Sequence, residues 1–242
     1  KRTGFSFYIY APKRCDDLRL RWTRPWPDAD WRSLLRIRRD YADAGVKFGV
    51  GLSPYALYRN LNSETERDLA TKLEYLDRLE LDILGIFFDD MPQGGADLAE
   101  LQVGIMSRVV AASQAKTFVF CPTFYSDDPL LTRLSGSIPE GYLATLGERL
   151  ECNVHIFWTG PKVCSEEISG AHIEDITQRL SASVHSTEKS VQPGSVPLKR
   201  PRPPGPGSSS RRNTSPSGVK NMVVGMTITR CCSTASDRIV PW

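Results

Sequence analysis

A regular alternation of short apolar runs with longer amphipathic runs constrains the fold of this chain more than any other feature. Apolar runs of about six residues, rich in β-branched and aromatic side chains, are typical of strands. We predict strands at residues 5–10, 46–52, 81–88, 116–121 and 153–158. We predict helices at 30–44, 63–79, 98–112, 141–150 and 168–180, the second opened by a capping box that starts at Ser63. Such an alternation predicts an α/β fold with a parallel sheet, and an open doubly wound sheet and a (β/α) barrel both fit it.

Polar residues follow each predicted strand, where both of these folds place their reactive side chains. In chain order they are Lys13, Ser53, Asp89 with Asp90, Tyr125 and Thr159. No phosphate-binding glycine fingerprint follows a strand, which disfavours a nucleotide-binding version of the fold.

Asp89 and Asp90 close the apolar run 83–88, so two adjacent carboxylates stand at the end of a buried strand. Burial and mutual repulsion both oppose the charge on such groups. This arrangement is typical of acid/base catalysis, in which one carboxyl holds a proton while the other does not. Adjacent residues of a strand point to different sides, so we expect the two carboxylates to reach different parts of a substrate.

The charge of the chain is divided between a body and a tail. Residues 189–242 hold nine of the 31 Lys and Arg residues but only one of the 28 Asp and Glu residues, so the net charge is +8 there and −5 over residues 1–188. Residues 190–219 are also rich in proline and glycine and contain no acidic residue. We therefore predict a globular domain over 1–188 and a disordered basic tail over 189–242, with one further strand possible within 219–229.

The remaining composition gives no sign of a metal, a cofactor, a membrane or a nucleic acid. The six cysteines and three histidines show no metal-ligand spacing, so we expect reduced thiols and no metal site. No window approaches the roughly 18 apolar residues of a membrane span. The first residues lack the pattern of a signal peptide, which predicts a cytoplasmic location. The acidic body does not resemble a nucleic-acid surface.

Four motifs carry a resemblance to a known family. They are Tyr10-Ala11-Pro12-Lys13, Phe87-Phe88-Asp89-Asp90, Phe120-Cys121-Pro122-Thr123-Phe124-Tyr125 and Trp158-Thr159-Gly160-Pro161-Lys162-Val163. In this order, across about residues 5–180, they resemble the catalytic domain of glycoside hydrolase family 84, the β-N-acetylglucosaminidases. The resemblance implies a (β/α)8 barrel of TIM-barrel type, here incomplete with about five strand–helix units. It also implies hydrolysis of terminal β-linked N-acetylglucosamine with retention, through an oxazoline formed by the substrate's own acetamido group and without a cofactor.

The resemblance also implies roles for single residues. Asp89 orients the acetamido nitrogen and assists its deprotonation, and Asp90 is the general acid and base. Lys13 binds a sugar hydroxyl, and Tyr125 lies beside the acetamido group. Thr159 and Val163 shape the pocket around the acetamido methyl group, although simple packing explains these two residues as well. Strand parity turns Trp158 away from the pocket, into the core.

One departure from the family pattern leaves the function open. The Trp-Asp-Asn motif, which in the family binds the outer sugar hydroxyls, does not occur in this sequence. Three hypotheses therefore stand: a glycosidase acting on a GlcNAc-bearing glycoprotein or glycoside, a catalytically impaired or merely sugar-binding relative, and a chain whose basic tail contacts anionic partners.

Overall fold

A parallel sheet forms the centre of the computed structural model, which describes residues 6–92, 94–182, 226–229 and 238–241. The sheet has seven strands in sequence order, and the first five run parallel. These five are β1 (Phe7–Tyr10), β2 (Lys47–Leu52), β3 (Ile83–Phe87), β4 (Thr117–Cys121) and β5 (Val154–Trp158). Each lies within two residues of its predicted range.

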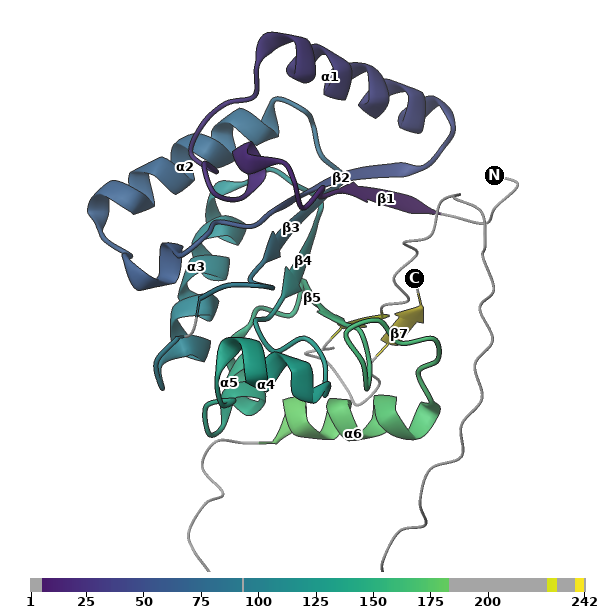
Figure 1. Ribbon diagram of the computed structural model, residues 1–242. Coiled ribbons are helices and arrows are strands. Elements are labelled where there is room, and N and C mark those ends of the chain that lie inside the picture. Colours follow the sequence, from purple (N-terminus) through teal and green to yellow (C-terminus); the bar gives the residue numbers. More distant parts are fainter. Residues whose placement is uncertain (1–5, 93, 183–225, 230–237, 242) are drawn as a thin grey trace, which may run out of the picture.

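Helices follow the parallel strands and lie along the outer side of the curved sheet (Figure 1). They are α1 (Asp28–Asp43), α2 (Ser63–Asp77), α3 (Leu98–Ala112), α4 (Pro129–Ser135), α5 (Tyr142–Arg149) and α6 (Gly170–Ser181), with two 3₁₀ turns, η1 (Asp16–Leu18) and η2 (Leu57–Arg59). Five were predicted. The sixth, α4, has seven residues, too few to show a helical period, and it begins with a local signal: Asp128 caps it and Pro129 opens it.

The start of α2 corrects the predicted capping box by one residue. Asn62, not Ser63, is the N-cap: its side chain accepts hydrogen bonds from the backbone N–H groups of Glu64 and Thr65. The Thr65 hydroxyl accepts one in return from the Asn62 N–H, at 3.0 Å. Asparagine and serine serve as N-caps about equally well, so the sequence alone did not separate the two positions.

The parity of β3 separates the core from the inner side of the sheet. Leu84, Ile86 and Phe88 are fully buried. Gly85 and Phe87 have the opposite parity and point to the inner side, and Asp89 continues this parity past the strand. The fold therefore places Asp89 on the inner side of the sheet, at the carboxyl end of β3.

Two strands lie within the tail that was predicted to be disordered. β6 (Met226–Thr229) pairs antiparallel with β5, and β7 (Arg238–Pro241) pairs antiparallel with β6. The prediction is wrong for these two segments, although β6 overlaps the strand thought possible within 219–229. The pairing has a clear physical reason, since β6 covers hydrogen-bonding groups that β5 would otherwise present at a sheet edge. The rest of the predicted tail lies outside the described residues.

The cysteines differ from expectation at one position. Cys152, just before β5, is disulfide-bonded. Cys15, Cys121 and Cys164 are free, as expected. No pattern in the sequence indicated the disulfide, because it depends on contacts that only the fold creates. No helix in the described ranges has both the length and the apolarity to cross a membrane.

Candidate active site

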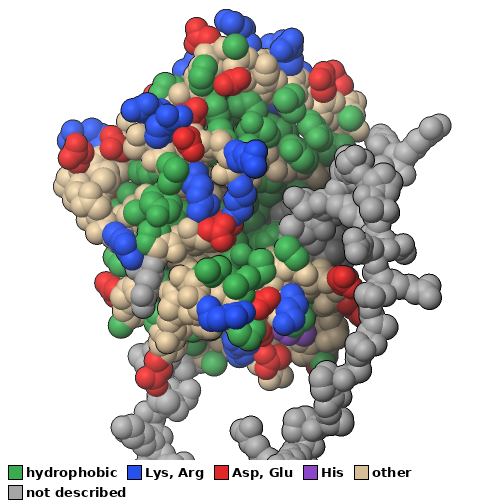
Figure 2. Space-filling model, in the orientation of Figure 1, with side chains coloured by type: hydrophobic (Ala, Val, Ile, Leu, Met, Phe, Trp, Pro, Cys, Tyr) green, Lys and Arg blue, Asp and Glu red, His purple; other side chains and the backbone are tan. Residues whose placement is uncertain are grey.

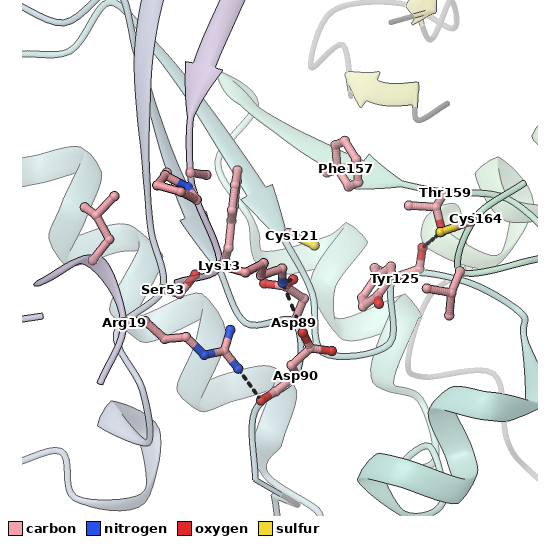
Figure 3. Close-up of a pocket in the computed structure, with 16 residues that line it drawn as sticks. Lys13, Arg19, Ser53, Asp89, Asp90, Cys121, Tyr125, Phe157, Thr159 and Cys164 are labelled. Carbon is pink, nitrogen blue, oxygen red and sulfur yellow. Dashed lines mark hydrogen bonds and ion pairs between the residues drawn. The ribbon is translucent and has the colours of Figure 1, made fainter. Parts of the chain in front are cut away.

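A pocket of about 360 Å³ opens at the carboxyl ends of the parallel strands (Figure 3). Its volume lies within the range of roughly 300–1,000 Å³ that is typical of small-molecule sites. All six predicted site residues line it: Lys13, Asp89, Asp90, Tyr125, Thr159 and Val163. Ser53, the polar residue that follows β2, lines it too. The polar residues that follow the parallel strands therefore lie together in one pocket.

The two aspartates share one cation. The Lys13 ammonium donates a hydrogen bond to the Asp89 carboxylate and a second to Asp90 Oδ2, at 3.1 Å. Asp90 has a φ of 53°, in the left-handed region that non-glycine residues seldom adopt. The chain has left the strand at this point, so the two carboxylates converge on Lys13 instead of diverging as strand geometry predicted. The Asp89 side chain is 13 % exposed and that of Asp90 47 %, so the two groups differ in their access to solvent.

Arg19 is a pocket residue that the sequence did not reveal. Its Nη2 donates to the backbone oxygen of Asp90 at 2.8 Å, and its guanidinium lies 5.8 Å from the centre of the Tyr55 ring. Arg19 lies just after η1 and does not directly follow a strand, so the search for polar residues at strand ends did not identify it. The contact ties the β1–α1 loop to the unusual backbone at Asp90.

The aromatic ring of Phe87, which lines the pocket, packs closely against two glycines. A Cβ atom on Gly51 would lie 2.5 Å from Phe87 Cε2, and one on Gly85 would lie 2.5 Å from Phe87 Cε1. These glycines are needed for the ring to lie flat against β2 and β3. Phe87 was not among the predicted pocket residues, although inner-face glycines on neighbouring strands are a signal for such a close approach.

Hydrogen bonds between two loops form the wall opposite Lys13. The Thr159 N–H donates to the Tyr125 carbonyl at 2.9 Å, and the Thr159 hydroxyl donates to the Lys162 carbonyl at the same distance. The Val163 N–H donates to Asp128 Oδ2 at 3.2 Å. Hydrogen bonds from the backbone N–H groups of Leu130 and Val163 lower the pKa of Asp128, so its carboxylate holds the Val163 loop and caps α4.

Two ionisable groups in the pocket stay neutral. Burial raises the pKa of the Tyr125 phenol far above its usual value, and the nearby Asp90 adds to that shift. Burial likewise raises the pKa of the Cys121 thiol. Tyr125 can therefore donate a hydrogen bond to a bound ligand across the neutral pH range.

Trp158 lies outside the pocket, as its strand parity predicted. It is 1 % exposed, and its indole N–H donates to His172 Nε2 at 3.0 Å. In the described part of the chain, no three His, Cys, Asp or Glu side chains are grouped closely enough to hold a metal ion.

Comparison with known proteins identifies the family of the chain. Residues 1–186 match the family model described as beta-N-acetylglucosaminidase. The chain is 28 % identical over 180 residues to the Protein O-GlcNAcase of Mus musculus and, equally, to that of Rattus norvegicus. These alignments cover 71 % of this chain and 19 % of each relative.

A solved structure is similar as well. A mutant of the O-GlcNAc hydrolase of Thermobaculum terrenum superposes with a TM-score of 0.63 at 29 % sequence identity. The match covers 74 % of this chain and 40 % of that structure. The chain thus spans well under half the length of these relatives.

Proposed function

Because the chain belongs to the β-N-acetylglucosaminidase family, we propose that it is a retaining glycosidase that removes terminal β-linked N-acetylglucosamine. The observation that carries this proposal is the Asp89–Asp90 pair, joined by Lys13 in the pocket at the strand ends. A GlcNAc-bearing glycoprotein or a small glycoside is the proposed substrate. The cytoplasmic location stays a prediction from the sequence.

The proposed first step forms an oxazoline. The oxygen of the substrate's acetamido group attacks the anomeric carbon, and the bond from that carbon to the leaving oxygen breaks. Asp90 gives its proton to the leaving oxygen while Asp89 accepts the acetamido N–H as a hydrogen bond and assists its deprotonation. The more exposed position of Asp90 supports this division, since the leaving group must lie toward solvent.

The proposed second step opens the oxazoline with water. Asp90, now a carboxylate, takes a proton from the water as its oxygen bonds to the anomeric carbon, and the proton on Asp89 returns to the acetamido nitrogen. Two displacements at one carbon give overall retention. Tyr125 would donate to the acetamido oxygen, and Thr159 with Val163 would enclose the methyl group. A sugar hydroxyl that binds Lys13 would replace one of its two carboxylate contacts.

Hydrolysis of aryl β-N-acetylglucosaminides by the whole chain tests the proposal. We expect Asp90→Ala to lower kcat/KM roughly 10²- to 10⁴-fold with a poor leaving group and much less with an activated one, because an activated leaving group needs little protonation. Asp89→Ala should slow both substrates, because cyclisation itself is impaired. Asp43→Ala, at the exposed end of α1, is the matched control.

Two results would count against the proposal. Full activity in Asp90→Ala would exclude that residue as the general acid. A folded wild-type chain without activity on either substrate would favour the impaired or sugar-binding alternative, in keeping with the missing Trp-Asp-Asn motif.

A further inference from the structure

A ring of buried hydrogen bonds contacts the backbone immediately before the aspartate pair. Its side chains are Thr123 in the β4–α4 loop, Gln102 on α3 and Tyr142 on α5, each at most 2 % exposed. The Thr123 N–H donates to the Tyr142 hydroxyl at 3.2 Å, and that hydroxyl donates to Gln102 Oε1 at 2.5 Å. Gln102 Nε2 then donates to Thr123 Oγ1 at 2.7 Å, which closes the ring.

One hydrogen bond from the ring reaches the backbone at the end of β3. The Thr123 hydroxyl donates to the Phe88 carbonyl at 2.9 Å. The Phe88 N–H donates to the Cys121 carbonyl at 2.8 Å, so Phe88 is held to the β4 segment at both its N–H and its carbonyl. The Phe88 carbonyl belongs to the peptide that joins Phe88 to Asp89. Holding that peptide in place therefore sets the position of the Asp89 backbone.

The donors and acceptors of the ring are matched to one another. Each hydroxyl gives one hydrogen bond and receives one, and the amide uses its nitrogen as donor and its oxygen as acceptor. A network of this kind tolerates little displacement, because a broken bond leaves a buried polar group unpaired. Apolar side chains could fill the same space, but they would not fix the orientation of a carbonyl.

We propose that the ring of Thr123, Gln102 and Tyr142 is a positioning device that sets the aspartate pair relative to Tyr125. Thr123 lies two residues before Tyr125, so one rigid segment carries both the hydrogen bond to the Phe88 carbonyl and the phenol that lines the pocket. The role rests on the proposed function, in which these carboxylates react. The three ring residues act through the backbone of Phe88 and Asp89 and are not themselves in contact with the substrate.

Hydrogen exchange of the whole chain, read on peptides spanning 83–92, tests the device without relying on activity. Thr123→Val keeps the shape of the side chain and removes its hydrogen bonds, whereas Thr123→Ser keeps the hydroxyl. Thr145→Val is the control, since Thr145 is also buried on α5 but lies outside the ring. We expect exchange in 83–92 to become roughly tenfold faster in Thr123→Val, from the loss of hydrogen bonds, and to stay near wild type in the other two.

Kinetics provide the second readout. A displacement of about 1 Å at a catalytic group can cost roughly 100-fold in rate. Thr123→Val should therefore lower kcat at least tenfold with KM nearly unchanged, for a poor and for an activated leaving group alike, and Thr123→Ser should recover most of the loss.

Each outcome decides a separate claim. Exchange in 83–92 that is unchanged in Thr123→Val, or equally raised in Thr145→Val, would overturn the positioning role. Faster exchange with unaltered kinetics would also overturn it, because the aspartates would then not depend on the ring. An inactive wild-type chain would count against the proposed function, while the exchange data would still decide whether the ring holds the strand end.

Discussion

At the scale of single residues, Arg19 shows how a side chain that follows no strand directly can still hold the backbone of a pocket residue in place. Its guanidinium binds the carbonyl of Asp90, whose left-handed backbone costs on the order of 1–3 kcal/mol. We expect Arg19→Met to lower kcat/KM roughly tenfold, since hydrogen bonds from charged groups contribute about 1.5–3 kcal/mol. Arg21→Met is the control, because Arg21 pairs with Asp16 and Asp17 at the surface. Equal losses in the two variants, measured by steady-state kinetics, would contradict this role.

The glycine under the Phe87 ring gives a second prediction at this scale. In Gly85→Ala the new methyl group would meet the ring, so we expect a loss of about 1–3 kcal/mol in the free energy of unfolding and a raised KM. Adding Phe87→Leu should recover part of the stability. Gly104→Ala on α3 is the matched control, since its Cβ would meet only the flexible end of Arg108 and helix propensity favours alanine by about 1 kcal/mol. Urea denaturation measures all four proteins, and a Gly85→Ala midpoint at or above that of wild type would refute the argument.

At the scale of elements, α2 supports the loop that carries Lys13 and Arg19. Lys72 is 2 % exposed, and its ammonium donates to the carbonyls of Asp17 and Arg24 at 2.9 and 2.6 Å while lying 4.8 Å from the Trp26 ring. Burial lowers the pKa of Lys72 to about 8, from an ordinary value of 10.5. The helix thus anchors the β1–α1 loop through a cation that the fold keeps away from water.

This lowered pKa predicts how stability depends on pH. Between pH 8 and 10.5 the unfolded chain binds the Lys72 proton more strongly than the folded chain, so this group makes stability rise with pH, by at most about 3 kcal/mol over the full window. Urea unfolding at pH 7, 8 and 9 should show the rise in wild type and in the exposed control Lys47→Met, but not in Lys72→Met. A rise of equal size in Lys72→Met would assign it to other groups.

The elements also show what the sequence could and could not predict. The periodicity of apolar residues predicted the five parallel strands and five of the helices, because it reflects which side chains each element buries. The expectation that polar residues gather past the ends of parallel strands predicted that Lys13, Asp89 and Tyr125 lie close together, and all three line one pocket. The same expectation did not identify Arg19, Phe87 or the ring of Thr123, Gln102 and Tyr142, because these depend on contacts between segments distant in sequence. The unexpected strands β6 and β7 have the same cause, since a sheet edge exists only once the sheet has formed.

At the scale of the whole molecule, the sheet continues past β5 through β6 and β7, and its inner side is open. Apolar and charged side chains line a hollow on this face (Figure 2). The β5 edge is covered by β6, through pairs such as Phe157 with Thr227. Since β6 lies between β5 and β7, its backbone N–H groups face one neighbour or the other. The molecule therefore depends on a distant segment to cover an edge that would otherwise pair with other chains.

A proline in β6 tests this dependence. Thr227→Pro removes one N–H donor from the middle of the ladder and introduces a ring that a central strand does not accommodate. We expect the free energy of unfolding to fall by at least about 1 kcal/mol, and self-association at micromolar concentration to rise in sedimentation measurements as the β5 edge becomes available. Ser209→Pro, in the proline-rich segment, is the control and should change neither quantity. A Thr227→Pro chain as stable and as monodisperse as wild type would show that β6 does not protect the edge of this sheet.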